Sequence, residues 1–449
     1  MNKKFYRNSD LRINRYFAKL IFRDQLIEAK KHGKNVFYNQ VRKLNNCYNA
    51  RKEQGDISVK DIFTRYWPEF KQKNEKRLSR KGLIESIESM ISCHNFDNGY
   101  LFYECPNCNE FYMVGFSCHS RFCTSCGQKY KNKRTIKVSE KCLNVPHRQF
   151  VFTIPEQLRQ YFRLYHDDLL NILFDAAKET INSVLEHHAP KKYKNEKRRF
   201  GYISFLHTFG RDLKYHPHLH ILIAERYLNN LGELKKFDYF HFDYIRITFQ
   251  NILFHKIYLY YKNVIKDYHQ TQEIYKKLKD LKKQYPDGYY FYGPKMIRRN
   301  DNIKDIKSLT NYVARYASHP AISERRILSL DTLNNTVTWY YDSHEDDDVN
   351  CEENKKGRQI ITEDVFSFME KLITHIPTKG FQQVRYYGFY SNKFKDKISN
   401  NKLFSDAQLT KMLDNTKWVK GLMNSFGYDP TLCVCGSQMY INYELSYYP

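Results

Sequence analysis

The chain has 449 residues, which at roughly 100 to 200 residues per domain is enough for two to four domains. It carries 74 Lys and Arg against 49 Asp and Glu, a formal net charge of +25, and 16% of its residues are aromatic, which excludes a disordered basic tail and indicates a folded protein with a polyanionic partner. No run approaches the length of about 18 apolar residues needed for a membrane span, and no apolar segment follows the basic N-terminus, so we expect a protein inside the cell with no membrane partner.

In chain order, residues 1–85 are predicted to form a basic helical region. Over residues 93–126 the composition changes to short pieces punctuated by Gly, Asn, Cys and Ser, which is typical of a small metal-stapled module. Arg148–Ile154 has the composition of a strand that stops at Pro155. Apolar residues at helical spacing then predict one amphipathic helix of about 28 residues.

The following segments, Tyr202–Phe209 and His218–Ala224, predict two strands joined by a turn around Gly210–Lys214. The remaining predicted elements are a long helix over 239–285, a short strand Tyr289–Tyr292, a helix Ile306–Ala317, a strand Thr336–Tyr341 and an acidic linker Glu345–Glu353. Together they predict an α+β fold, an antiparallel sheet with flanking helices, preceded by the metal-binding module and the helical N-terminus. No phosphate loop of the G-x-x-x-x-G-K-[ST] type is present, so the chain is not expected to use ATP.

Two C-x2-C pairs dominate the metal-binding module: Cys105 with Cys108, and Cys123 with Cys126, fourteen residues apart. In a chain without an export signal, such pairs indicate metal ligation and not disulfide bonds. Zn2+ is the common structural metal that accepts four thiolates in a tetrahedron. The sequence therefore predicts that these four cysteines bind one structural Zn2+, with a set of unrelated buried thiols as the alternative.

Other residues near this module leave the ligand set open. Cys118 lies between the two pairs, and Cys93 and His94 lie just before them, so each could replace a ligand or support one. Near the C-terminus, Cys433-Val-Cys435 is a contracted pair, which argues against a second zinc ion.

A second metal-binding motif is the His218-Leu-His220 pair, which runs into an apolar strand. Residues two apart on a strand point to the same face, so the two imidazoles can grip one divalent cation. His207, on the preceding strand, is the best candidate for a third ligand, with a histidine in the core as the alternative. His216 extends the motif to the spacing of histidine-triad nucleotide hydrolases, although Pro217 interrupts the strand and weakens that interpretation.

Tyr312 and Tyr316 form the third motif, in Asn311-Tyr-Val-Ala-Arg-Tyr316. Residues four apart on a helix lie on one face, so both phenols would point the same way. Core packing is the alternative in a chain with 38 Tyr. A functional role for the two tyrosines is favoured because the histidine pair precedes them in the chain.

Taken together, these motifs resemble the two-tyrosine, rolling-circle insertion-sequence transposases of the HUH (His, hydrophobic, His) endonuclease superfamily that carry an N-terminal zinc-binding domain. The segments that carry the resemblance, in the family's order, are Cys105–Cys108, Ser117–Cys126, Pro146–Pro155, Leu206–Gly210, His216–His220, Tyr312–Tyr316 and Lys379–Gly388. Phe122 departs from the family, which usually has His at that place.

The resemblance implies a DNA strand-transfer enzyme. His218 and His220 would hold Mg2+ or Mn2+ on the scissile phosphate, and Tyr312 or Tyr316 would attack it to give a 5′-phosphotyrosine and a free 3′-OH. The substrate would be single-stranded DNA or the hairpin ends of a mobile element, and the protein would be cytoplasmic and nucleoid-associated.

We therefore divide the chain into four parts: a helical basic region (1–85), a zinc-binding DNA-recognition domain (86–145), an HUH nuclease domain (146–343) and a C-terminal accessory region (344–449). Three alternatives remain. A plasmid replication initiator or relaxase would share the chemistry, a non-catalytic zinc-dependent DNA-binding protein would explain the charge and the cysteines, and a histidine-triad hydrolase would explain the three histidines.

Overall fold

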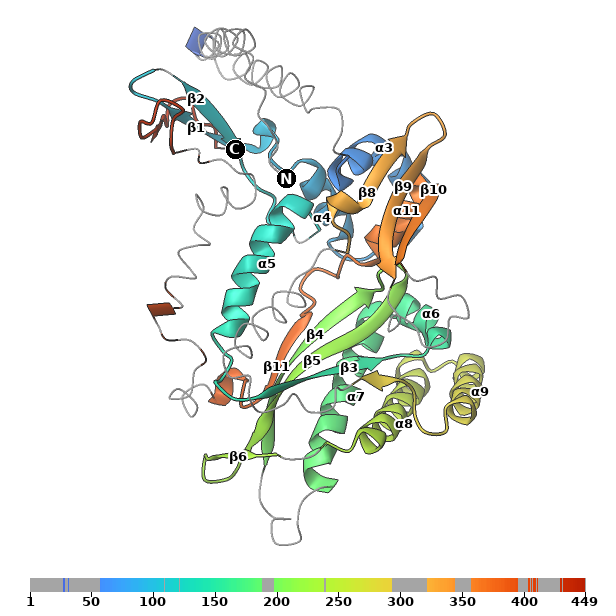
Figure 1. Ribbon diagram of the computed structural model, residues 1–449. Coiled ribbons are helices and arrows are strands. Elements are labelled where there is room, and N and C mark those ends of the chain that lie inside the picture. Colours follow the sequence, from blue (N-terminus) through green and yellow to red (C-terminus); the bar gives the residue numbers. More distant parts are fainter. Residues whose placement is uncertain are drawn as a thin grey trace.

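The computed structural model describes residues 57–108, 110–120, 122–187, 198–237, 240–292, 321–343, 357–394 and 431–448, with a few single positions elsewhere. The strand pairings within these ranges are antiparallel, and helices flank the sheets, so the predicted α+β class is confirmed (Figure 1). Among the helices described, none combines the length and the apolar character that crossing a bilayer requires. The predicted helix Ile306–Ala317 and the acidic linker lie outside the described residues.

The central sheet has six strands in the order β11-β4-β5-β3-β7, with β6 paired to β5. Their bounds are β3 (His147–Thr153), β4 (Arg199–Phe209), β5 (Tyr215–Leu228), β6 (Leu234–Lys236), β7 (Phe291–Tyr292) and β11 (Val384–Gly388). The predicted strands that correspond to β3, β4 and β5 are confirmed, as is the turn between β4 and β5. At the β4–β11 edge, Gly388 has a φ of 57°, and a Cβ there would overlap the carbonyl oxygen of Phe200.

Helices cover one face of this sheet: α6 (Glu156–Leu164), α7 (His166–His187), α8 (Phe242–Tyr260) and α9 (Tyr268–Gln284). Leu206, Leu219 and Ile221 point into the core that these helices form. Phe205, Leu222 and Ala224 belong to a separate core on the opposite face. The alternation of these residues follows from the period of two in a strand.

Two helices predicted to be continuous are broken. The helix after Pro155 is interrupted at Tyr165, and the helix predicted over 239–285 is interrupted by a π-helical turn, Tyr261–Ile265, and by Lys266 in the left-handed region (φ 59°). No Pro or Gly marks either break. The two breaks meet in space, because the Tyr165 ring lies 5.7 Å from that of Tyr260 and 5.6 Å from that of Tyr261, centroid to centroid. The two helices are therefore interrupted where their aromatic side chains pack against each other, and not at a helix-breaking residue.

A second unit combines segments from before and after the sheet: α3 (Val59–Lys73), α4 (Leu83–Ile91), β8 (Ile327–Asp331), β9 (Thr336–Ser343), β10 (Gly357–Asp364) and α11 (Val365–Thr374). The three strands pair in the order β10-β9-β8, and β9 confirms the strand predicted at Thr336–Tyr341. Phe63, Trp339 and Phe368 are fully buried in its common core. The domain boundaries at residues 85 and 344 remain predictions. Residues before and after each of these positions pack in this one core.

The third unit is a small sheet of β1 (Tyr100–Glu104), β2 (Phe111–Gly115) and β12 (Tyr440–Ile441), in the order β12-β1-β2. Helix α5 (Thr124–Ser139) leads from the cysteine-bearing loops to β3 of the central sheet (Figure 1). Short 3-10 helices occur at Glu75–Leu78, Phe96–Asn98 and Glu324–Arg326.

Candidate metal centres

Three histidines meet on the face of the central sheet that α6 to α9 leave uncovered. His207 on β4 is the direct cross-strand partner of His218 on β5, and His220 lies two residues further along β5 on the same face. One ring nitrogen from each residue lies within 4.8 Å of those from the other two. The structure thus brings together the predicted pair and the candidate third ligand, His207.

The orientation of His218 suits a metal ligand. Its Nδ1 lies 2.7 Å from the carbonyl oxygen of His216, which can only accept, so Nδ1 carries the proton and Nε2 the lone pair. That Nε2 lies 3.0 Å from Nε2 of His220, a separation that two neighbouring ligands of one ion span when metal–nitrogen bonds are about 2.1 Å. Burial lowers the pKa of His218 to about 3, so the ring is neutral near pH 7.

His216 does not join this group among the described residues. Its Nε2 lies 2.6 Å from the hydroxyl oxygen of Thr153 on β3, and burial lowers the pKa of His216 to about 3. Pro217 does not end the strand as expected from the sequence. Instead β5 has one extra residue between the His207–His218 and Phe209–Tyr215 pairs, a β-bulge that accommodates the missing N–H of proline.

The four cysteines predicted to bind one zinc ion are divided between two clusters. Cys123 and Cys126, at the start of α5, meet Cys93 and Cys118. Cys105 and Cys108, after β1, meet Cys433 and Cys435. The expectation of a single Cys105–Cys108–Cys123–Cys126 site was therefore wrong, because local C-x2-C spacing brings two thiols together but does not decide which other pair they face.

The first cluster is formed by Cys93, Cys118, Cys123 and Cys126. The Sγ atom of Cys126 lies 3.5 Å from that of Cys93 and 3.6 Å from that of Cys118. A disulfide needs about 2.05 Å, whereas two ligands of a tetrahedral zinc with Zn–S bonds of about 2.3 Å lie roughly 3.8 Å apart. The donor set and the spacing fit Zn2+. His94 is turned away, with its Nδ1 3.2 Å from the carbonyl oxygen of Gly115.

The second cluster also has zinc-like spacing, with Sγ–Sγ distances of 3.5 Å for Cys105–Cys435 and 3.4 Å for Cys108–Cys433. The expectation that the short spacing of Cys433 and Cys435 argues against a second metal site was therefore wrong, because the fold brings both thiols to Cys105 and Cys108. A signal in the sequence was available, because Gly436 follows the pair and permits the tight turn that brings two cysteines one residue apart to the same point.

The remaining predicted site residues, Tyr312 and Tyr316, lie outside the described residues, as does Arg315 between them. Of the basic residues that flank the cysteines, Lys133 and Lys137 lie on one exposed side of α5, four residues apart. The helix that carries these two lysines begins at the first cysteine cluster, with Cys123 as its N-cap.

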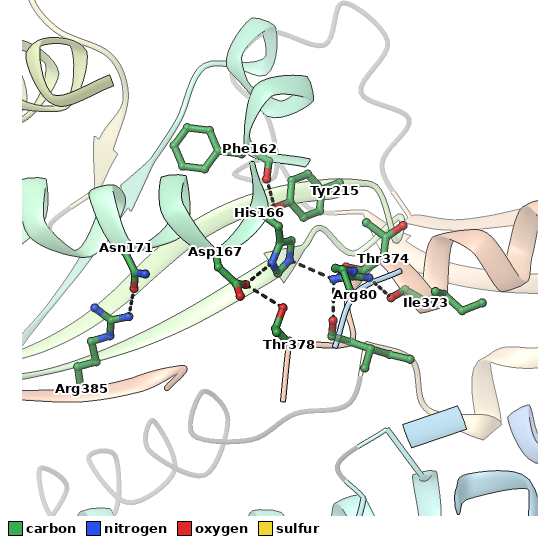
Figure 2. Close-up of polar contacts among 11 residues, drawn as sticks. Arg80, Phe162, His166, Asp167, Asn171, Tyr215, Ile373, Thr374, Thr378 and Arg385 are labelled. Carbon is green, nitrogen blue, oxygen red and sulfur yellow. Dashed lines mark hydrogen bonds and ion pairs between the residues drawn. The ribbon is translucent and has the colours of Figure 1, made fainter. Parts of the chain in front are cut away.

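Polar contacts lie at the start of β5 and at the adjoining helices, next to the histidines in the chain (Figure 2). Arg80 donates hydrogen bonds to the carbonyl oxygens of Ile373 and Ile376, both 2.8 Å away, at the end of α11, and lies 3.3 Å from Nε2 of His166. In the neighbouring contact, Tyr215, the first residue of β5, donates to the carbonyl of Phe162. Arg80 thus links the second unit to α7 through His166, and Tyr215 links the start of β5 to α6, one residue before His216.

Additional links in Figure 2 fix the start of α7. His166 and Thr378 both bond Oδ1 of Asp167, each at 2.9 Å, and Arg385 of β11 donates to Asn171. Since α7 packs on the sheet, these contacts tie the strands and the helical layer into one support for the histidines.

Comparison with known proteins accounts for this combination. Residues 62–154 match the family model described as "Transposase zinc-binding domain", and residues 201–397 match the one described as "Putative transposase". The first range contains the first cysteine cluster, and the second contains the three histidines. Both models describe transposases, and the chain is similar to them over both ranges.

Two curated relatives carry transposase names as well. The chain is 25% identical over 382 residues to "Transposase for insertion sequence element IS801" of Pseudomonas savastanoi pv. phaseolicola, an alignment covering 79% of this chain and 82% of that protein. It is 22% identical over 346 residues to "Putative transposase y4qJ" of Sinorhizobium fredii, covering 75% and 81%. No solved structure gives a significant match to this chain.

Proposed function

We propose that this chain is a transposase that cuts and rejoins single-stranded DNA through a covalent 5′-phosphotyrosine, as in rolling-circle transposition. The observation that carries the proposal is the convergence of His207, His218 and His220 on one face of an antiparallel sheet. Support also comes from the net charge of +25 and from the relatives, which are named as transposases, one of them for an insertion sequence. Acting on DNA, the protein would work in the cytoplasm at the nucleoid.

The three histidines would hold the catalytic ion. A divalent cation bound there would neutralise charge on the scissile phosphate as the transition state develops. Imidazole nitrogens suit Mn2+ better than Mg2+, which prefers an all-oxygen environment, so we propose Mn2+ as the better cofactor of the two. The neutral His218 presents its Nε2 lone pair without first losing a proton.

Tyr312 and Tyr316 are the proposed nucleophiles. The phenol loses its proton, its oxygen forms a bond to phosphorus, and the bond from phosphorus to the 3′ oxygen breaks, leaving a 3′-OH. Because the phosphodiester energy is kept in the phosphotyrosine, rejoining needs no ATP, which agrees with the missing phosphate loop. With two tyrosines, one could hold a first DNA end while the other attacks a second.

The two cysteine-rich regions would support binding and not the reaction itself. We propose that Cys93, Cys118, Cys123 and Cys126 bind a structural Zn2+ that orients the start of α5, whose exposed Lys133 and Lys137 can contact phosphates. A single-stranded or hairpin substrate is favoured because the phosphate must reach histidines on a sheet face.

The decisive experiment is incubation with labelled single-stranded oligonucleotides that cover the DNA flanking this gene. We expect a covalent adduct with Mn2+ that peptide mapping places on Tyr312 or Tyr316. Each Tyr→Phe change alone should leave some cleavage, and the double change should abolish the adduct. An adduct on another tyrosine, or cleavage without any adduct, would disprove the assignment of the nucleophile.

A further inference from the structure

The small β12-β1-β2 sheet is closed by a segment from the far end of the chain. Tyr440–Ile441 of β12 pairs with Tyr103 and Glu104 of β1, and further backbone hydrogen bonds join Tyr100 and Tyr447 in both directions. Glu104, which is 2% exposed, accepts hydrogen bonds from the Tyr440 hydroxyl at 3.1 Å and the Asn442 amide at 3.0 Å. These contacts give residues 431–448 one defined register on β1.

Two tight turns face each other at the end of this sheet. In one, the N–H of Cys105 donates to the carbonyl of Glu110, and in the other the N–H of Cys433 donates to that of Ser437. Gly436, with a φ of 86°, makes the second turn possible. Each turn presents two thiols, and Sγ atoms from opposite turns lie 3.4 and 3.5 Å apart.

Two of the four thiols accept a hydrogen bond from a backbone amide. The backbone N–H of Glu110 donates to Cys108, and that of Ser437 donates to Cys435. Such amide donors are the usual outer contacts of metal-bound sulfur. Cys105 and Cys433 are buried, whereas Cys435 is exposed, so the site lies at the surface with an open route for the ion.

The apolar core around this site is small. It consists of Tyr103, Cys105, Val114, Cys433 and Met439. The other face of the sheet buries a second small cluster, Phe96, Tyr100, Phe102, Phe111 and Leu445. Neither face carries a large core, and a sheet this small gains stability from a metal site or a disulfide. The four cysteines, whose sulfur atoms are spaced like zinc ligands, can provide such a metal site.

We propose that Cys105, Cys108, Cys433 and Cys435 bind a second structural Zn2+, which anchors residues 431–448 as the third strand of the sheet. The family model for the zinc-binding domain ends at residue 154 and so includes only half of this ligand set. The inference does not depend on the proposed DNA chemistry.

Zinc content tests the proposal, measured on full-length protein purified without chelator. A His218→Ala/His220→Ala background prevents zinc from being counted at the histidine site. We expect two equivalents in this background and one after adding Cys433→Ser/Cys435→Ser. The matched control is Cys142→Ser, because Cys142 is buried outside both clusters, and it should keep two.

Backbone hydrogen exchange provides the second readout. Loss of the ion should deprotect residues 431–448 in the Cys433→Ser/Cys435→Ser variant while leaving β4 and β5 protected, and Cys142→Ser should change neither. One equivalent of zinc in the background protein, unchanged by the double substitution, would overturn the proposal. Two disulfides joining Cys105 to Cys435 and Cys108 to Cys433, found by mass spectrometry under reducing purification, would overturn it equally.

Discussion

His207 and His218 face each other across the β4–β5 pair, and the ring centroids of His207 and His220 are 4.9 Å apart. Two backbone strands, joined by a five-residue turn, thus fix the relative positions of all three rings. A ligand set carried on paired strands loses little conformational entropy when it binds an ion, because the backbone is already ordered.

Removal of the histidine ligands should strongly reduce cleavage without unfolding the protein. We expect His218→Ala/His220→Ala to reduce oligonucleotide cleavage by about 100-fold or more, because metal assistance contributes several kcal/mol to the transition state. His207→Ala should lower the affinity for Mn2+, measured by calorimetry. His269→Ala, an exposed histidine on α9, is the matched control. Near-normal cleavage by the double variant would rule out the histidine site.

His375 should make stability fall at acid pH. Its Nε2 donates to the carbonyl of Leu213 at 3.0 Å and its Nδ1 accepts from the Thr208 hydroxyl at 3.2 Å, so the ring is held neutral. Burial lowers the pKa of His375 to about 4, with Arg80 and Arg163 adding to the effect and Leu213 and Asp212 opposing it.

The direction of the pH effect on stability follows from the pKa of His375 in the folded and unfolded states. The unfolded chain, with a pKa near 6.5, takes up a proton before the folded one, so stability is lost as pH falls from about 6.5 to 4, by roughly 3 kcal/mol for this group. Denaturant unfolding of the wild type and His375→Gln across this range gives the difference. If both lose stability equally, His375 is not the titrating group.

Arg80→Lys should destabilise the second unit, because Arg80 joins the segment before α4 to the end of α11. A lysine cannot reproduce the forked donors that bond the carbonyls of Ile373 and Ile376, and leaving one of them unpaired costs about 1 to 3 kcal/mol. Thermal unfolding measures the loss. Arg77→Lys is the control, because the Arg77 side chain is 72% exposed and its ion pair with Glu370 is 3.5 Å long. Equal effects of both changes would contradict this role for Arg80.

Cys118→Ser should release one zinc ion and loosen the second unit. Cys93, Cys123 and Cys126 belong to the core that also contains α3, α4 and α11, so the ion and this core should unfold together. Structural zinc contributes on the order of 10 kcal/mol in small modules, and a lower melting temperature with one fewer equivalent is expected. Unchanged zinc content in Cys118→Ser would show that Cys118 is not a ligand.

Local patterns predicted the strands around the histidines well. A period of two and a polar turn placed β4 and β5, and they put His218 and His220 on one face. The position of His207 stayed open because a one-residue slip in register would have turned it to the other face. The bulge at Pro217 sets that register, and a bulge depends on both strands, which local sequence does not specify.

Local sequence patterns could not predict which cysteine pairs share a cluster. Spacing identifies each C-x2-C pair, but Cys93 lies 33 residues from Cys126, and Cys433 lies 325 residues from Cys108. Contacts of that separation are decided by how the three units pack. The helix breaks at Tyr165 and Tyr261 were missed for a similar reason, since the contact between them stabilises both.

The distant origin of Cys433 and Cys435 sets an order of events during synthesis. All four thiols of the first cluster leave the ribosome within a few dozen residues of one another, so that cluster can load its ion early. Cys108 must wait for 325 more residues before Cys433 is made, which at 5 to 20 residues per second takes roughly a quarter of a minute to a minute. During that interval β1 has an open edge, and a nascent chain that stops early never closes it.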